Sequence, residues 1–164
     1  MTTYHHFSKI ILTIGIPGSG KSTWVNKYVQ QYPFTKVIST DKIREELTGQ
    51  EQCINPSQNP MIHEEARKRV KAILDDPENY KGGNHGMGPE IIVDATNVEV
   101  EEWIRYKKLD PTLFVCKIFD VPPKQALQMQ EQRERKVPLH ILEMKWKQLQ
   151  QNKHFIPCFF NMIL

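Results

Sequence analysis

The segment Gly15–Thr23, GIPGSGKST, places three glycines, a lysine and hydroxyl side chains directly after the apolar run Ile10–Ile14. Its first eight residues fit the pattern G-x-x-x-x-G-K-[ST] of the phosphate-binding P-loop. In this pattern the glycines let successive backbone N–H groups face one concavity, which holds phosphate oxygens. A helix that begins near the lysine adds the positive end of its dipole. The segment therefore predicts a binding site for a nucleoside triphosphate.

Two side chains of this segment have specific expected roles. Lys21 can reach the outer phosphates, and the Ser22 hydroxyl can hold Mg²⁺. ATP, or another NTP, and Mg²⁺ are thus the expected cofactors. The other residues expected to contact the nucleotide are Gly15, Pro17, Gly18, Ser19, Gly20 and Thr23.

Asp41 and Arg44 lie in the segment ISTDKIR, where a second β-rich segment gives way to a helical pattern. A kinase needs a carboxylate near the hydroxyl that attacks the γ-phosphate. The two residues are three positions apart, so a helix would place them on one face. Together they could hold a hydroxyl and an adjacent phosphate of the substrate. The alternative is that Asp41 merely caps the helix, a common position for aspartate.

Asp94 ends the apolar segment IIVD. At the carboxyl end of a strand its side chain would point into the expected cleft, and we assign it to Mg²⁺-bound water or to orienting Arg44. Thr96 and Asn97 are further candidates for substrate contact. However, Thr96 also forms a T-x-x-E capping box with Glu99, and Asn97 could equally be a cap residue.

Arg133, Arg135 and Lys136 come together in the segment EQRERK, before Val137 and Pro138. Arginines in a short linker between two helices can close over a triphosphate and neutralise charge that builds on the transferring group. On this interpretation Arg133 and Arg135 bind the nucleotide, and Arg133 is slightly favoured as the catalytic one. The alternative is a solvated basic helix end, where cations offset the helix dipole.

The elements that must position these residues alternate along the chain. Strands are expected at residues 10–14, 35–40, 91–97 and 113–121, and helices at 21–32, 41–48, 60–74, 99–109, 123–135 and 139–149. No hairpin signal separates consecutive strands. We therefore predict an α/β fold of three layers, in which a short parallel sheet is covered by helices on both faces and carries a small helical lid. Ligands of such sheets bind beyond the carboxyl ends of the strands.

The residues outside the P-loop select among the classes of P-loop protein. A GTPase would need an NKxD motif, which the sequence lacks, since DATN is its nearest string. A motor ATPase normally has a carboxylate pair at a strand end, whereas Asp94 is followed by Ala95. A small kinase fits best.

The composition of the chain limits the number of domains, the kinds of metal or disulfide site, and the cellular location. The 164 residues carry a formal charge of +3 and suit one domain. The three cysteines, Cys53, Cys116 and Cys158, form no CxxC pair, and Cys116 is expected in the core. The six histidines show no metal-ligand spacing. With no secretory signal and no membrane-spanning run, a cytoplasmic location is expected.

The chain is expected to divide into a flexible N-terminus, residues 1–8, a P-loop kinase domain, residues 9–152, and an apolar tail, residues 153–164. The tail, HFIPCFFNMIL in its main part, is unusually apolar. It could dock on the domain, contact another subunit in a homo-oligomer, or mark the junction to a fused or partner repair domain.

Five segments in one order resemble the P-loop kinase domain of phage-type 5′-polynucleotide kinases. They are KIILTIGIPGSGKSTW, Asp41 with Arg44, IIVDATN, FDVP at Phe119–Pro122 and RKVP at Arg135–Pro138. The resemblance runs from about Lys9 to about Met144. It implies transfer of an NTP γ-phosphate, usually from ATP, to the 5′-hydroxyl of DNA or RNA, with Mg²⁺.

The resemblance also implies roles for individual residues. It makes Asp41 the general base on the 5′-hydroxyl, and Arg44 a contact to the acceptor phosphate and the reacting group. Asp94 would support the site, and a lid arginine would grip the triphosphate. Met129 and Gln130 depart from the family, whose members often carry an Arg-Asn pair there.

Two rival functions stay open at this point. One is a kinase for a small-molecule hydroxyl, similar to zeta toxins or antibiotic phosphotransferases, and the other is a non-catalytic nucleotide-binding module. Two basic clusters, EEARKRVK ending at Lys71 and RYKK at Arg105–Lys108, would suit a nucleic acid, but each one alone is best interpreted as a solvated helix face. DNA or RNA preference, donor preference and oligomeric state are not predicted.

Overall fold

The computed structural model describes residues 7–51, 56–81 and 88–164. His5, His6, Cys53 and His85 lie outside these ranges, as does most of the predicted flexible N-terminus. Within that predicted segment, Ser8 is buried and exchanges two hydrogen bonds with Thr112, one of 3.0 Å and one of 3.2 Å.

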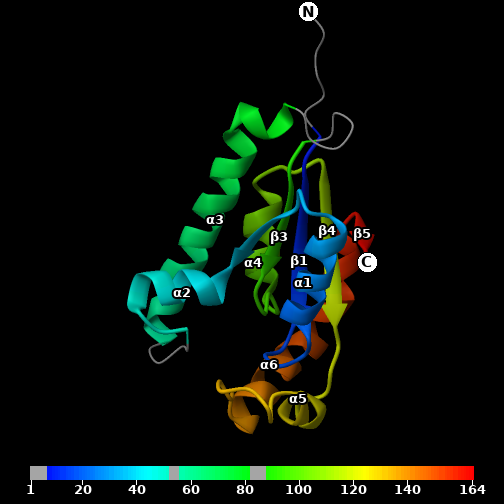
Figure 1. Ribbon diagram of the computed structural model, residues 1–164. Coiled ribbons are helices and arrows are strands. Elements are labelled where there is room, and N and C mark those ends of the chain that lie inside the picture. The colour runs from blue at the N-terminus through cyan, green and yellow to red at the C-terminus, as the bar shows by residue number, and fades with distance from the viewer. Residues whose placement is uncertain (1–6, 52–55, 82–87) are drawn as a thin grey trace, which may run out of the picture.

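Five parallel strands form one sheet in the order β2-β3-β1-β4-β5 (Figure 1). Their bounds are β1 Lys9–Gly15, β2 Lys36–Ser39, β3 Glu90–Asp94, β4 Leu113–Phe119 and β5 Met162–Ile163. The four strands expected from the sequence are confirmed, and β5 was not expected. The central strand is apolar on both faces, because helices cover both sides of a parallel sheet. Ile10, Ile11, Leu12 and Ile14 are all fully buried.

Seven α-helices and three short 3₁₀ segments belong to the described residues. The helices are α1 Lys21–Gln31, α2 Thr40–Thr48, α3 Asn59–Asp75, α4 Val100–Lys107, α5 Pro123–Met129, α6 Leu139–Asn152 and α7 Ile156–Phe159. The 3₁₀ segments are Pro56–Gln58, Pro77–Tyr80 and Lys153–Phe155. None of these helices is long and apolar enough to cross a membrane.

The two faces of the sheet are covered by different helices. Ile11 packs with Val25 of α1 on one face, whereas Ile10, Leu12 and Ile14 pack against α3, α4 and α6 on the other through residues such as Val70, Trp103 and Leu149. The odd and even positions of β1 thus point to opposite layers, as the period of a strand requires. The predicted three-layer α/β fold, that of a P-loop kinase, is confirmed.

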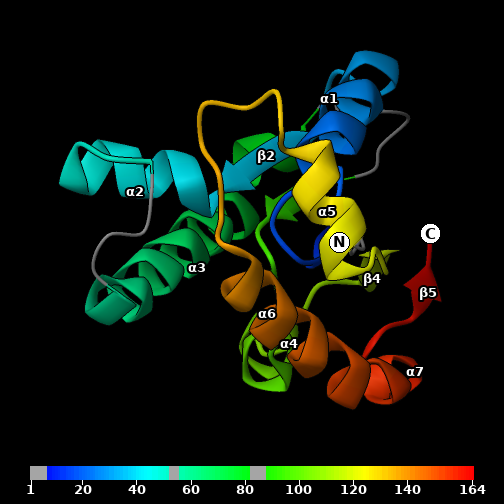
Figure 2. The ribbon, with the colours of Figure 1, turned by 90° about the horizontal axis from the view of Figure 1, so that it is seen from below.

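The helix expected over residues 123–135 ends early, at Met129. The side chain of Gln130 is buried and bonds the backbone of Val137 twice: its Nε2 donates to the carbonyl at 3.0 Å, and its Oε1 accepts from the N–H at 3.1 Å. These bonds close residues 130–137 into a loop, so Arg133 and Arg135 lie in a connection rather than on a helix. Figure 2 shows this connection reaching from α5 toward α2 before it turns back to α6.

The apolar tail docks on the domain. Phe160 is buried and stacks on Phe114 of β4 at 4.5 Å between ring centroids, and it meets Trp103 of α4 edge-on at 5.6 Å. Backbone bonds from Asn161 to Phe114 (2.7 Å) and from Leu164 to Cys116 (2.8 Å) attach β5 to β4. Cys116 itself is fully buried, as expected.

Replacing Phe160 by alanine tests whether this docking stabilises the core. We expect Phe160→Ala to lower the free energy of unfolding by about 3 kcal/mol, because it removes a buried aromatic ring and leaves a cavity. Phe155→Ala, five residues earlier, is the matched control, since this ring is 44% exposed. Its effect should stay below about 1 kcal/mol. Urea denaturation measures both, and equal effects would contradict a tail that belongs to the core.

Candidate active site

A cavity of about 930 Å³ lies at the edge of the sheet where β1, β2 and β3 end. Eleven of the residues predicted for the site line it: Pro17, Gly18, Gly20, Lys21, Ser22, Asp41, Arg44, Asp94, Thr96, Arg133 and Arg135. Four others, Gly15, Ser19, Thr23 and Asn97, are not among its lining residues. The structure thus brings residues from four distant segments to one cavity.

The P-loop curls as its sequence predicts, through two of its three glycines. Gly18 and Gly20 adopt φ values of 77° and 91°, which favour glycine over other residues. Gly15 has a different reason to be glycine, because a Cβ there would lie 2.8 Å from the Phe119 Cβ of the neighbouring strand. Gly20 is the N-cap of α1, and no side chain caps the helix, so its first N–H groups are left for a ligand.

Lys21, the first residue of α1, is held under the loop. Its side chain is buried, and its Nζ donates to the carbonyl of Ile16 at 2.7 Å. Burial lowers the pKa of Lys21 to about 8, against the raising effects of the Asp94 and Asp41 carboxylates. A buried ammonium with one hydrogen bond has donors left for phosphate oxygens, whose negative charge would raise the pKa of Lys21 again.

Ser22 and Asp94 face each other where β3 ends. The Ser22 hydroxyl donates to Oδ2 of Asp94 at 3.0 Å. Burial raises the pKa of Asp94, while the charge of Lys21 and the Ser22 hydrogen bond lower it. This carboxylate is short of positive charge in its surroundings, and a hydroxyl oxygen stands beside it. Oxygen ligands of this kind suit Mg²⁺.

Asp41 is held by two arginines from different segments. Nη1 of Arg44 lies 2.8 Å from its Oδ1, and Nη1 of Arg135 lies 2.7 Å from its Oδ2. The capping alternative for Asp41 is wrong, because Ser39 is the N-cap of α2 and its side chain accepts from the N–H of Lys42. Asp41 lies in the first turn of α2, and its carboxylate lines the cavity, paired with the two arginines.

The side chain of Arg44 is buried, unlike the arginine of a typical surface ion pair. It is 8% exposed. Besides Asp41, it donates through Nη1 to the carbonyl of Glu51 at 3.3 Å and through Nη2 to Oδ1 of Asn59 at 3.2 Å. These bonds fix the guanidinium in the cavity wall between α2 and α3. Sequence reasoning missed Asn59, since nothing in its spacing links it to Arg44.

The two lid arginines both reach the cavity. Arg135 contacts Asp41, as described. The charges of Arg133 and Arg135 both act to lower the pKa of Lys21, in the same direction as its burial. The connection between α5 and α6 therefore brings two cations to the cavity that holds the P-loop.

Thr96 and Asn97 do not cap α4. The helix begins at Val100 after Glu99, and no side chain caps it. Thr96 lines the cavity, but Asn97 is buried, with its Nδ2 donating to the carbonyls of Thr13 (2.9 Å) and Val93 (3.3 Å). The expectation of a substrate contact does not fit this placement of Asn97, whose amide instead ties the end of β3 to β1.

The cavity wall includes further polar residues that the sequence did not single out. His63 on α3 has a lowered pKa, mainly from burial, and its Nδ1 lies 3.7 Å from Oε2 of Glu102. Lys145 on α6 pairs with Glu99 at 3.5 Å across the cavity mouth. Only the fold brings them near the P-loop, so no local signal predicts them.

Removing the charge of Lys21 should stabilise the ligand-free protein. The folded-state pKa of Lys21, about 8, lies below its ordinary value of 10.5, so the unfolded chain binds the extra proton between these pH values. Below pH 8 the buried charge opposes folding in full, and this penalty fades as the pH rises toward 10.5.

We therefore expect Lys21→Met to raise the free energy of unfolding by about 2 kcal/mol at pH 7, after allowing for the lost hydrogen bond, and to lower it by about 1 kcal/mol at pH 10.5, where little of the charge penalty is left to offset that bond. Lys27→Met, at an exposed position of the same helix, should show no such trend. Urea denaturation across this pH range measures both. A Lys21→Met gain that does not shrink with rising pH would contradict the assigned pKa.

The AAA domain family matches residues 10–154. A chain of the Pnkp1/Rnl/Hen1 RNA repair complex is similar in structure, with a TM-score of 0.73 and 23% identity over 93% of this chain and 47% of that chain. The present chain thus spans about half the length of that relative.

Two small-molecule kinases share the fold more distantly. A gluconokinase from Sinorhizobium meliloti 1021 has a TM-score of 0.56 and 14% identity, covering 97% of this chain and 82% of its own. Shikimate kinase from Acinetobacter baumannii, in complex with shikimate, has a TM-score of 0.55 and 13% identity, covering 98% and 84%. The chain therefore belongs to the AAA domain family, over residues 10–154, and has the nucleotide-binding fold of a P-loop kinase.

Proposed function

We propose that this protein is a polynucleotide kinase, which transfers the γ-phosphate of ATP or another NTP to the 5′-hydroxyl end of DNA or RNA. The observation that carries the proposal is the placement of the Asp41 carboxylate in the same cavity as Lys21 of the P-loop. An acid and a phosphate cradle that line one cavity can hold an alcohol and a phosphate donor together.

The donor would lie against the P-loop. The N–H groups at the start of α1 and the ammonium of Lys21 contact its phosphates, and Arg133 approaches them from the lid. Ser22 and Asp94 would hold Mg²⁺, because they supply a hydroxyl and an undercompensated carboxylate side by side. When bound, the ion would neutralise charge on the phosphate oxygens.

The acceptor hydroxyl would lie against Asp41. The carboxylate takes the hydroxyl proton while the hydroxyl oxygen forms a bond to the γ-phosphorus, and the bond from that phosphorus to the β–γ bridging oxygen breaks. The NDP leaves with the electron pair of that bond. Arg44, fixed by Glu51 and Asn59, orients the carboxylate and faces the first phosphate of the acceptor. Arg135 holds the other carboxylate oxygen and must turn away to admit the acceptor.

A nucleic-acid acceptor is favoured by the motif pattern and by the likeness to a chain of an RNA repair complex. The gluconokinase and the shikimate kinase keep a small-molecule acceptor as the second candidate. A nucleotide-hydrolysing ATPase is less suited, since Ala95 stands where a second carboxylate would orient water. The proposal has two further parts. The protein would act in the cytoplasm. It would also contact, through its apolar tail, either a partner or fused repair domain or a second copy of this chain.

Replacing Asp41 by alanine separates catalysis from nucleotide binding. Asp41→Ala should lower kcat for phosphate transfer by roughly 100-fold or more, because general base catalysis typically contributes that much. Nucleotide affinity should remain, since Asp41 lies on the acceptor side. Glu45→Ala, at an exposed position of the same helix, is the control and should be fully active. Phosphate transfer at the wild-type rate by Asp41→Ala would contradict the assignment of Asp41 as the general base.

The acceptor class is tested by offering labelled ATP with several alcohols to the unmodified protein. We expect label on a 5′-hydroxyl oligonucleotide and none on a 5′-phosphorylated one. Nucleosides, gluconate, shikimate and free sugars are offered as the alternative acceptors. Efficient labelling of a small molecule, with none on the oligonucleotide, would favour the second candidate.

The two lid arginines should have separable effects. Arg133→Ala is expected to weaken nucleotide binding by about tenfold, the value of one charge-assisted hydrogen bond. Arg135→Ala should change nucleotide affinity by less than about twofold while lowering the KM for the acceptor, because it removes the ion pair that occupies Asp41. Titration with a fluorescent ATP analogue measures the nucleotide affinity of both variants, and steady-state kinetics measure their phosphate transfer. A larger loss of nucleotide affinity for Arg135→Ala than for Arg133→Ala would contradict the proposed roles.

A further inference from the structure

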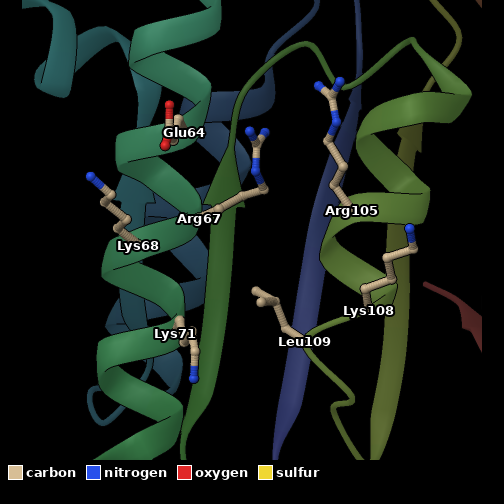
Figure 3. Close-up of a pocket in the computed structure, with 7 residues that line it drawn as sticks. All are labelled: Glu64, Arg67, Lys68, Lys71, Arg105, Lys108 and Leu109. Atoms are coloured by element: carbon tan, nitrogen blue, oxygen red, sulfur yellow. The ribbon is translucent and has the colours of Figure 1, made fainter.

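The two basic clusters of the sequence face each other across one groove. A shallow hollow of about 270 Å³ lies between α3 and α4 and is lined by Glu64, Arg67, Lys68, Lys71, Arg105, Lys108 and Leu109 (Figure 3). Five of its seven lining residues are cations. Figure 3 shows Arg67 extending from α3 into the space between the helices, with Arg105 opposite it on α4. Each cluster alone resembles a solvated helix face, but the fold joins the two into one basic surface.

A buried carboxylate organises the centre of this basic groove. Glu102 is 5% exposed and pairs with Arg67 at 2.9 Å and with Arg105 at 2.7 Å, through different oxygens. One negative charge thus holds two guanidinium groups in place, and a positive charge remains between them. Fixed cations of this kind lose little side-chain entropy when they bind an anion.

The outer cations of the groove are free to bind. Lys68 and Lys108 are exposed and form no ion pair with any residue that the structure describes. Lys71 pairs with Asp75 one turn along the helix, in an exposed contact that contributes little to stability. These lysines are therefore available to a solvated polyanion without breaking a structural interaction.

The basic groove and the active-site cavity follow one another along α3. Asn59 and His63 of α3 line the cavity, and Arg67 and Lys71 follow on successive turns of the same helix. Lys71 lies about 12 Å along the axis from His63, since an α-helix rises about 1.5 Å per residue. Glu102 connects the two hollows, because it contacts His63 on one side and Arg67 on the other.

We propose that the basic groove between α3 and α4 binds the phosphate backbone of the acceptor strand, downstream of the 5′-end that enters the cavity. This inference rests on the proposed function and extends it from the reacting end to the following nucleotides. A linear row of cations that leads away from the Asp41 side of the cavity matches a linear row of phosphates. A gluconate-sized acceptor would fit entirely within the cavity and would not reach this groove.

Charge reversal at the two free lysines tests the groove without touching the active site. The double variant Lys68→Glu/Lys108→Glu is compared with Lys27→Glu/Lys36→Glu, which makes the same change of net charge at exposed positions of α1 and β2. The probe is a fluorescent, 5′-phosphorylated single strand of about 12 nucleotides, which binds but cannot accept a phosphate. Fluorescence anisotropy at several salt concentrations gives the affinity and its salt slope.

The groove variant should bind the probe about tenfold more weakly at low salt, and the slope of log K against log salt should fall in magnitude by about 1.4, because two phosphate contacts are lost. The control should keep the wild-type slope. Equal affinities and slopes for both double variants would overturn the proposal. So would unchanged binding of the strand together with a loss of binding to phosphatidylserine vesicles, since the surface would then serve a membrane.

Phosphate transfer distinguishes failure of the groove from failure of the proposed function. With ATP as donor, the groove variant should show a raised KM for a 5′-hydroxyl strand of about 12 nucleotides and an unchanged kcat and KM for a dinucleotide. Equal effects on both acceptors would contradict a contact that lies downstream. If the wild-type protein phosphorylates no 5′-hydroxyl, the proposed function fails by itself, whatever the anisotropy shows.

Discussion

The burial of one ammonium group is the constraint on which the site depends. Lys21 sits beneath the P-loop with a single hydrogen bond to Ile16 and with its pKa lowered to about 8. A charge in such surroundings is unfavourable unless an anion lies beside it, so the loop and the start of α1 form a site whose chemistry suits an anion. Phosphate oxygens would replace the water that the lysine has lost. Two glycines with positive φ and one with no room for a Cβ hold this arrangement on the central strand.

Much of the fold follows from local signals, because alternating β-rich and helical segments without hairpins allow few topologies. The four main strands, the helix behind the P-loop and the cap of α2 by Gly49 are read from such signals. The strand β5 could not be, since Met162–Ile163 is only two residues long and depends on bonds from β4 that no local pattern reveals. The end of α5 was misjudged for a similar reason. Gln130 looks like one more helical residue, and only its distant bonds to Val137 show that it ends the helix.

The residues of the site also fall into those that local signals predict and those that only the tertiary structure reveals. Residues that follow the ends of strands, such as Asp41 and Asp94, are predictable because parallel strands end at one edge of the sheet. The sequence suggests Asn97 as a substrate contact, but its side chain bonds backbone carbonyls in the interior, on two strands that only the fold brings together. Asn59, His63 and Lys145 reach the cavity from helices whose direction is set by packing on the sheet. The meeting of two basic helices over Glu102 is likewise a property of the tertiary structure.

The two bonds between Gln130 and Val137 set the size of the loop that carries the lid arginines. They join the two ends of this loop, so residues 131–136 stand on a fixed base. Arg133 and Arg135 both reach the cavity from within it. A single buried amide side chain therefore fixes the point from which two cations approach the site.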